Sequence, residues 1–217
     1  MVVQKGLTSK VYFVLPADQE LARLESLVQQ AIAGDVGMIQ YREKRKTTRK
    51  MVEEANRLRQ ITGASAVPLI INDRVDVALA VGADGVHVGG HDMPVALARR
   101  ILGPRGLIGA TTPDRRSMKV AEDEGADYVA VGPVFASPTK PEKAVVGVET
   151  LVKRIQQTSL PVCAIGGINT ENAAELAETR ISLAAVVSAV ADADDPAQAV
   201  RQLNEALGEP GDQWIPA

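Results

Sequence analysis

The stretch Leu69-Ile70-Ile71-Asn72-Asp73-Arg74 is an apolar run that ends in an amide, a carboxylate and a guanidinium. This is typical of a buried parallel strand whose carboxyl end opens onto a polar site. A second run, Gly85-Val86-His87-Val88-Gly89, follows one helix later and precedes Asp92. Because neighbouring parallel strands end at the same edge of a sheet, Asp73 and Asp92 are predicted to lie close together. Two carboxylates with an amide and no nearby cysteine suit Mg²⁺, although an Asp after a strand is also a common helix N-cap.

The composition is that of one globular domain, residues 1–217, with 46% hydrophobic and 24% charged residues. A formal charge of −3 gives no reason to expect nucleic acid as a partner. The only cysteine, Cys163, excludes an internal disulfide and is expected in the core. No apolar run approaches the roughly twenty residues that a membrane span needs. We therefore expect a cytoplasmic protein, with residues from about 208 to 217 as a C-terminal tail that carries Trp214.

Apolar strand-like runs alternate with segments of helical spacing along the whole chain. The strands are expected at residues 11–15, 36–41, 69–72, 86–88, 107–110, 127–131, 162–165 and 183–187. The helices are expected at 20–33, around 51–61, at 75–81, 93–102, after a Thr112 cap with Pro113 first, at 147–157, from near 169, and from 195 onward. Eight such units predict a single-domain (β/α)₈ TIM barrel. A doubly wound open sheet is the alternative, but no strand leads into a Gly-x-Gly-x-x-Gly turn.

In a barrel of this kind the site lies at the carboxyl ends of the strands. After the second strand, Gln40, Arg42 and Lys44 alternate with their neighbours and so share one direction with Met38. Three inward polar or cationic groups require an anion. The alternative is a solvated helix face, which suits Arg45, Lys46, Arg49 and Lys50 better.

Other strand ends carry further candidates. His87 is either a hydrogen-bonded core residue or a ligand contact, and Thr111 follows the fifth strand. The long connection from 132 to about 146 holds Ser137, Thr139 and Lys140 between prolines, which predicts a rigid anion-binding lid.

The loops after the seventh and eighth strands, with Gly166-Gly167 and Val187-Ser188, often bind phosphate in this fold. This inventory predicts two anion sites. Arg42, Lys44 and Lys140 with the metal suit a diphosphate, and the glycine amides with Ser188 suit a monophosphate. A diphosphate held in this way is a leaving group, so we expect a phosphorylated acceptor to displace pyrophosphate.

The motifs in this order resemble those of thiamine-phosphate synthases over essentially the whole chain. They are Gln40-Tyr-Arg-Glu-Lys44, Ile71-Asn-Asp73, Gly85-Val-His-Val-Gly89 with Asp92, Gly125-Ala-Asp-Tyr-Val-Ala-Val-Gly-Pro-Val-Phe135, Thr139-Lys-Pro141, Ala164-Ile-Gly-Gly-Ile168 and Val186-Val-Ser-Ala189. The resemblance implies the (β/α)₈ fold, Mg²⁺ dependence, and the joining of hydroxymethylpyrimidine diphosphate to a thiazole phosphate with release of pyrophosphate. It also implies a dissociative mechanism, in which pyrophosphate leaves before the thiazole nitrogen attacks.

The resemblance implies roles for individual residues, matched position by position. The pyrimidine diphosphate would be held by Gln40, Arg42, Lys44, Asn72 and Lys140. His87 would line the pyrimidine pocket, and Asp73 and Asp92 would bind Mg²⁺. The thiazole phosphate would be held by Ser137, Thr139, Gly167, Val187 and Ser188. Thr111 keeps the hydroxyl of the serine that the family often has, and with Arg42, Lys44 and Lys140 it completes the expected catalytic set.

Two departures from the family pattern leave alternatives open. Gly90-His91 replaces the usual residues before Asp92, and Thr111-Thr112-Pro113 replaces a Ser-Thr-His type sequence. A sister group, the thiazole tautomerases, diverges in this half of the site and isomerises a thiazole phosphate. A non-enzymatic protein that binds thiamine precursors is the third reading. Retention of the diphosphate and metal residues favours the synthase, and a homo-oligomer is left open.

Overall fold

A computed structural model describes residues 7–136 and 144–210. The strands are β1 (Val11–Val14), β2 (Met38–Tyr41), β3 (Leu69–Asn72), β4 (Gly85–Val88), β5 (Leu107–Thr111), β6 (Tyr128–Val131), β7 (Val162–Ile165) and β8 (Leu183–Val186). The helices are α1 (Leu21–Ala33), α2 (Thr48–Ala64), α3 (Val75–Val81), α4 (Val95–Leu102), α5 (Arg115–Asp123), α6 (Val148–Ile155), the 3₁₀ helix η1 (Ala173–Thr179), α7 (Ser188–Ala191) and α8 (Pro196–Leu207). Within these ranges, none of the helices combines the length and the apolar character needed to cross a bilayer.

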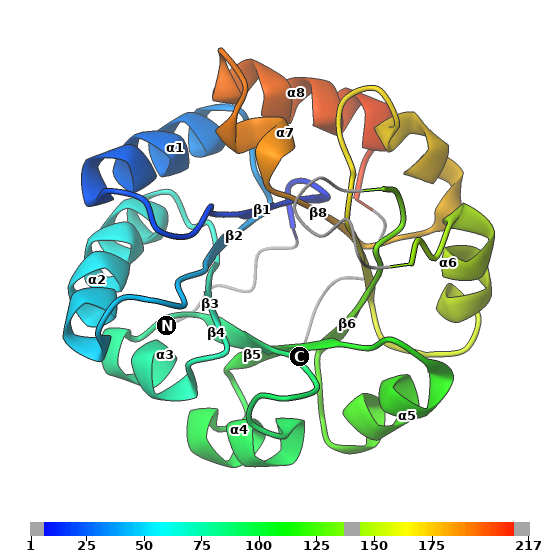
Figure 1. Cartoon of the computed structure of the whole chain (residues 1–217), viewed down its shortest axis with the longest axis horizontal. Coiled ribbons are helices and arrows are strands. Elements are labelled where there is room, and N and C mark those ends of the chain that lie inside the picture. The colour runs from blue at the N-terminus through cyan, green and yellow to red at the C-terminus, as the bar shows by residue number, and fades with distance from the viewer. Residues whose placement is uncertain (1–6, 137–143, 211–217) are drawn as a thin grey trace.

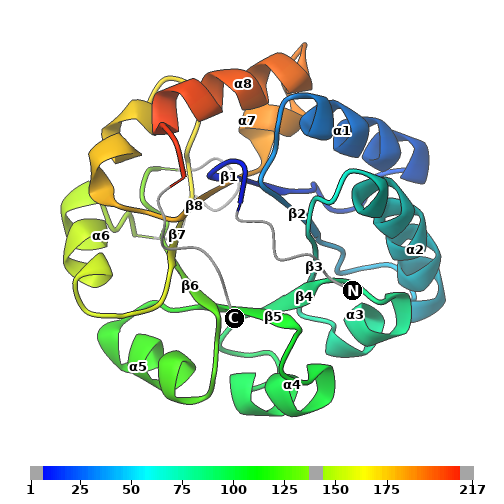
Figure 2. The same ribbon diagram turned by 180° about the vertical axis from the view of Figure 1, so that it is seen from behind.

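The strands close into a parallel barrel in the order β1 to β8, with β8 pairing back onto β1. Figure 1 looks down the barrel, with the helices forming a ring around the strands, and Figure 2 shows the same ring from behind. Every neighbouring pair is parallel, for example Gln40 opposite Ile70 and Asn72 opposite His87. The predicted TIM barrel is confirmed.

The core has two layers, because successive strand residues point to opposite faces. The layer inside the barrel is formed by Tyr12, Val14, Met38, Ile70, Tyr128, Ala130, Cys163, Leu183 and Ala185. The larger layer lies between the strands and the surrounding helices. Met38 faces the barrel interior as predicted, and the interior polar groups lie above it toward the strand carboxyl ends.

The Gly-Ala-Asp sequence that recurs before β4 and β6 has a structural role at the opposite end of the barrel. Asp84 accepts a hydrogen bond from the Leu69 amide at 2.8 Å, and its carboxylate lies 3.4 Å from Arg59. Asp127 makes the equivalent contacts, with its carboxylate 2.6 Å from Arg99. Each Asp therefore ties one strand to the strand and helix before it.

Two predicted elements differ in the structure. Thr112 does not cap α5: it is buried and its amide donates to Ala130, whereas Asp114 forms the cap through a reciprocal pair of bonds with Ser117. Asp114 is the cap because its side chain lies at the solvated end of the helix and can accept from the Ser117 amide, whereas the Thr112 side chain is buried. The helix predicted from near residue 169 is the 3₁₀ helix η1, which starts only at Ala173 after a turn held by Asn169 and Asn172.

Candidate active site

Asp73 and Asp92 both lie at the carboxyl ends of the strands, and neither caps a helix. Asp73 has a left-handed backbone (φ 61°), and its amide donates to the carbonyl of His87 at 2.8 Å. The next residue, Arg74, occupies the N-cap position of α3, and its side chain makes no capping bond. A left-handed non-glycine residue costs free energy and is concentrated at functional sites. The Asp73 carboxylate is instead paired with Lys44 at 2.9 Å.

The two carboxylates converge, as the sequence predicts. Burial raises the pKa of Asp92, and the hydrogen bond and charge of Asp73 raise it further, while the Gly89 amide lowers it by donating at 2.8 Å. In the ranges that the structure describes, no third acidic, His or Cys side chain joins them. Mg²⁺ takes one or two carboxylates and keeps several waters. The donor set therefore fits this ion, which would relieve the repulsion between the two groups.

Two potential donors at the carboxyl ends of β2 and β3 have no partner among the described residues. Asn72 is 8% exposed, and its Nδ2 is the buried side-chain polar atom that has no hydrogen-bond partner among the described residues. The guanidinium of half-buried Arg42 likewise has no ion pair or hydrogen bond within residues 7–136 and 144–210. Because an unsatisfied buried donor is costly, Asn72 Nδ2 indicates a missing acceptor, such as an anionic oxygen.

The loop between β2 and α2, which carries Lys44, is held by Glu43, a residue to which sequence analysis gave no role. Its buried carboxylate accepts from the amides of Lys44 at 2.6 Å, Arg45 at 2.8 Å and Asp18 at 3.0 Å. Burial raises the pKa of Glu43, but these amides outweigh it and the net pKa is lowered. Glu43 therefore fixes the backbone that presents Arg42 and Lys44.

A buried ion pair supports the same loop. Glu54 is fully buried, accepts from Lys46 Nζ at 2.9 Å and from the Tyr41 hydroxyl at 2.7 Å. Lys46 is thus not on the solvated face to which the sequence assigned it. Lys46 and Glu54 are 8 residues apart in the sequence, and this short separation could have indicated the ion pair. The sequence spacing does not show that either residue is buried. A buried charge of this kind is tolerated because it is paired and hydrogen-bonded.

We expect Glu43→Gln to lower the free energy of unfolding by about 1–3 kcal/mol, because one amide oxygen replaces two carboxylate oxygens and loses the charge-assisted bonds. Urea unfolding followed by circular dichroism measures this. Glu53→Gln is the matched control, since Glu53 lies exposed on α2 with Lys50 3.9 Å away, and it should change stability by less than about 0.5 kcal/mol. Equal effects of the two variants would contradict the assigned role.

A chain of hydrogen bonds crosses the barrel interior from Gln40 on β2 to Thr111 on β5. Gln40 Nε2 donates to Tyr12 Oη at 2.6 Å, which lies 3.0 Å from Tyr128 Oη. His87 Nδ1 is 3.1 Å from Tyr128 Oη, and its Nε2 is 2.9 Å from Thr111 Oγ1. Burial lowers the pKa of His87 to about 4, against an opposing effect of Asp73, so the ring is neutral near pH 7. His87 is therefore hydrogen-bonded at both ring nitrogens inside the barrel, and Thr111, exposed at the mouth, is its outer partner.

The loops after β7 and β8 leave from neighbouring strands, because Ile165 pairs with Ala185. Gly166 and Gly167 both have left-handed backbones, with φ of 99° and 68°. Among the described residues, no backbone carbonyl accepts from the amides of Gly167, Val187 or Ser188. Free amides on adjacent loops can bind an anion. The remaining predicted residues of this half, Ser137, Thr139 and Lys140, lie outside the described residues, as does Trp214.

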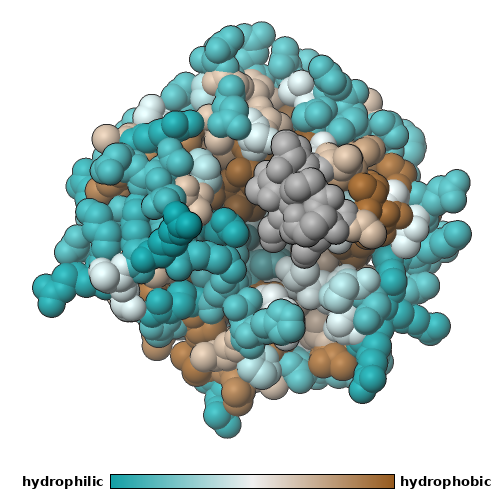
Figure 3. Space-filling view, viewed as in Figure 1, coloured by the Kyte–Doolittle hydropathy of each residue, from teal (hydrophilic) through white to brown (hydrophobic). Residues whose placement is uncertain are grey.

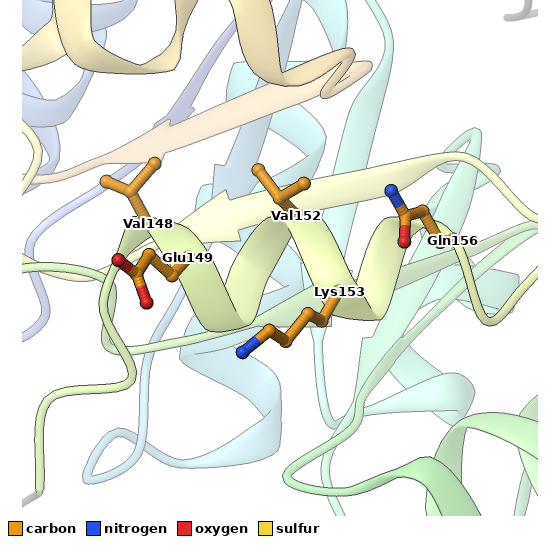
Figure 4. A pocket seen from close by; sticks show the side chains of 5 residues that line it. All are labelled: Val148, Glu149, Val152, Lys153 and Gln156. Carbon is orange, nitrogen blue, oxygen red and sulfur yellow. The ribbon is translucent and has the colours of Figure 1, made fainter.

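Two hollows are present in the described part of the surface. One, of about 350 Å³, lies beside the site between the loops after β4 and β5, and its lining includes Gly89, Asp92 and Thr111. The other, of about 440 Å³, lies along α6, where Val148 and Val152 project from one side of the helix (Figure 4). It is an open depression remote from the carboxylates. Figure 3 shows hydrophilic side chains over α2 and α3, on the same face as Figure 1. We place the site at the carboxyl ends of the strands, because the hollow there is lined by Asp92, whereas the hollow along α6 is not.

Comparison with known proteins identifies related sequences and a related structure. The family model described as thiamine monophosphate synthase matches residues 11–190. The thiamine-phosphate synthase of Chloroflexus aurantiacus is 48% identical over 196 residues, which are 89% of this chain and 90% of that protein. The corresponding protein of Archaeoglobus fulgidus is 43% identical and covers 90% of this chain and 91% of its own. The solved thiamine phosphate pyrophosphorylase from Pyrococcus furiosus matches with a TM-score of 0.82 at 38% identity, over 91% of this chain and 95% of that one.

Proposed function

This chain belongs to the thiamine monophosphate synthase family and is a transferase of thiamine biosynthesis, and we propose that it joins hydroxymethylpyrimidine diphosphate to a thiazole phosphate with the help of Mg²⁺. The observation that carries the proposal is the convergence of Asp73, Asp92 and Lys44 beside the unsatisfied amide of Asn72. This arrangement suits a diphosphate and a hard cation. The single cysteine, free and buried, is compatible with a cytoplasmic setting.

In this proposal the diphosphate lies over the carboxylate pair. Asp73 and Asp92 would hold Mg²⁺, and the bound ion would supply positive charge to neutralise the leaving pyrophosphate. Lys44 and Arg42 bind diphosphate oxygens, and Asn72 Nδ2 donates the hydrogen bond that it lacks in the protein alone. The left-handed backbone of Asp73 holds its carboxylate in place before substrate binds, so little reorganisation is needed.

The mechanism that fits these residues is departure of pyrophosphate followed by attack of the thiazole nitrogen on the pyrimidine cation. The site holds cations and amides near the leaving group, and its one histidine in a strand is neutral and engaged at both nitrogens. Catalysis then consists of positioning and leaving-group stabilisation, with no general base required. Gln40 and Thr111 would contact the pyrimidine from the rim of the interior chain.

The acceptor's monophosphate is assigned to the loops after β7 and β8. The amides of Gly167, Val187 and Ser188, for which no described backbone carbonyl is an acceptor, would bind its oxygens. Ser137, Thr139 and Lys140 are assigned to the site on the family motif alone. The tautomerase alternative needs a positioned proton-transfer group, and His91 is its candidate. His91 is exposed and has no hydrogen bond or ion pair in the described ranges, which favours the synthase.

The test is incubation of the purified protein with both substrates and Mg²⁺, with chromatographic detection of thiamine phosphate and a coupled assay for pyrophosphate. We expect both products in equal amounts, and neither in excess EDTA, because the leaving group loses its neutralising ion. Restoring Mg²⁺ should restore the rate. Isomerisation of a thiazole phosphate carboxylate in EDTA that is lost in His91→Ala would overturn the proposal in favour of the tautomerase.

A further inference from the structure

We propose that Lys44 couples the binding of Mg²⁺ to the binding of the diphosphate, because its ammonium competes with the ion for the carboxylate of Asp73. The inference rests on the proposed function for the identity of the two ligands, and it concerns how they enter the site together. Its basis is the ion pair between Lys44 Nζ and Asp73 Oδ2 at 2.9 Å, which places a cation on one of the two carboxylates assigned to the metal.

The balance of charge at the strand ends favours two ligands of opposite sign over either one alone. Asp73 and Asp92 lie within hydrogen-bonding range of each other, and the end of β2 supplies two cations, Arg42 and Lys44. A divalent ion added alone would meet the Lys44 ammonium on the same carboxylate and leave an excess of positive charge. A diphosphate added alone would leave an excess of negative charge. Because charges at such short range interact strongly, the pair of ligands is accommodated better than either one.

The contacts around Lys44 confine its movement to the side chain. The Lys44 amide donates to Glu43 Oε1 at 2.6 Å, which holds the backbone at this point. Asp73 is held as well, by its left-handed backbone and by the bond from its amide to the His87 carbonyl at 2.8 Å. The side chain of Lys44 is 53% exposed, against 20% for that of Asp73. Its flexible four-carbon stem can therefore carry the ammonium from one partner to another while both backbones stay in place.

The exposure of the Lys44–Asp73 ion pair allows it to be exchanged. Partly exposed ion pairs contribute little net stability, because water screens them and the long side chain loses freedom in forming them. Lys46 in the same loop is different: its side chain is 18% exposed and pairs at 2.9 Å with Glu54, whose side chain is 1% exposed. Breaking that pair would leave a buried charge without a partner, which is costly. Of these two paired lysines, Lys44 is therefore the one that can change partners.

The diphosphate supplies the second partner for the ammonium. Asn72, the residue directly before Asp73, has a buried Nδ2 without a hydrogen-bond partner among the described residues, which indicates an anionic acceptor at this strand end. When a diphosphate oxygen is bound there, the Lys44 ammonium transfers from the carboxylate to the phosphate, and Asp73 is released to the ion. Each ligand thus removes the obstacle to the other, which is positive coupling between two binding events.

Calorimetric titration of Mg²⁺ alone, and of inorganic pyrophosphate at saturating Mg²⁺, tests the coupling in the wild type and in Lys44→Met. We expect Lys44→Met to bind Mg²⁺ alone about five- to fiftyfold more tightly than the wild type, because Asp73 loses its competing cation. The same variant should bind pyrophosphate about tenfold or more weakly, because a phosphate oxygen loses a charged donor. A variant that is merely damaged would bind both more weakly.

Two further variants serve as controls. Lys50→Met removes the same charge from α2, where the Lys50 ammonium lies 3.9 Å from the carboxylates of Glu53 and Glu54, and it should leave the Mg²⁺ affinity unchanged. Lys44→Arg keeps a cation opposite Asp73 and should keep the wild-type affinity for Mg²⁺ alone. The coupling is refuted if Lys44→Met binds Mg²⁺ no more tightly than the wild type, or if Lys50→Met increases the affinity equally.

These titrations contain no pyrimidine or thiazole substrate, so their outcome is separate from that of the activity assay. A protein that makes thiamine phosphate, but whose Mg²⁺ affinity is the same with Lys44 and with methionine at this position, would refute the coupling alone. A protein that makes no thiamine phosphate, but binds Mg²⁺ more tightly as Lys44→Met, would refute the proposed function and leave the competition for Asp73 in place.

Discussion

Replacing Asp92 with asparagine is expected to lower the rate of thiamine phosphate formation about a hundredfold or more at limiting Mg²⁺. Asparagine keeps an oxygen that can accept from the Gly89 amide, so the turn is preserved. It removes the negative charge that converges with that of Asp73, and the proposed ion requires both charges. Steady-state rates over a range of Mg²⁺ concentrations, with calorimetric titration of the ion, separate loss of ion affinity from loss of the chemical step.

Asp127→Asn is the matched control for this experiment. Asp127 also accepts a backbone amide and also lies beside a cation, Arg99 at 2.6 Å, but at the opposite end of the barrel. It should lower the free energy of unfolding and leave the rate per folded molecule unchanged. A wild-type rate for Asp92→Asn at limiting Mg²⁺ would remove the carboxylate pair from the mechanism. An equal loss of rate in both variants would point to general damage.

The barrel could be predicted because each strand can be recognised from its local sequence. Runs such as residues 69–72 are continuously apolar, which is the mark of a strand covered on both faces, and the turn residues between runs separate eight units. The convergence of Asp73 and Asp92 followed from the same pattern, since parallel strands end at one edge. The Thr112 cap failed because two candidate caps stand two residues apart. The choice between them depends on which side chain is buried by β6.

The supporting residues of the site could not be predicted in the same way. Tyr12 and Tyr128 look like ordinary strand residues, and only closure of the barrel brings their hydroxyls together. Glu43 and Lys46 belong to a charged run that is typical of a solvated surface. Their burial depends on how the loop folds back over Glu54, which is a tertiary property. Spacing identifies which groups share a face, but it does not show which of them are desolvated and paired.

Gly167 is the position where backbone geometry and ligand binding depend most directly on each other. Its φ of 68° is one that residues with a side chain rarely adopt, and a methyl group there would overlap the carbonyl oxygens of Phe135 and Ala136. The segment after β6 is bonded to this loop, since the Phe135 amide donates to Gly166 at 3.0 Å. Any side chain at 167 must therefore displace either this loop or the segment after β6 that packs against it.

We expect Gly167→Ala to weaken thiazole phosphate binding about ten- to a hundredfold, the effect of losing one or two hydrogen bonds to a charged oxygen. The affinity for pyrimidine diphosphate should change little, because that ligand is assigned to the carboxylate side of the barrel. Calorimetric titration of each ligand measures the two affinities. Gly82→Ala is the control for backbone strain, since Gly82 has a similar φ of 60° with open space around it, at the end of α3. It should cost about 1–2 kcal/mol of stability and leave both affinities unchanged. Equal weakening of both ligands in Gly167→Ala would mean that the loop holds the barrel together rather than the phosphate, and undiminished thiazole phosphate binding would place the monophosphate elsewhere.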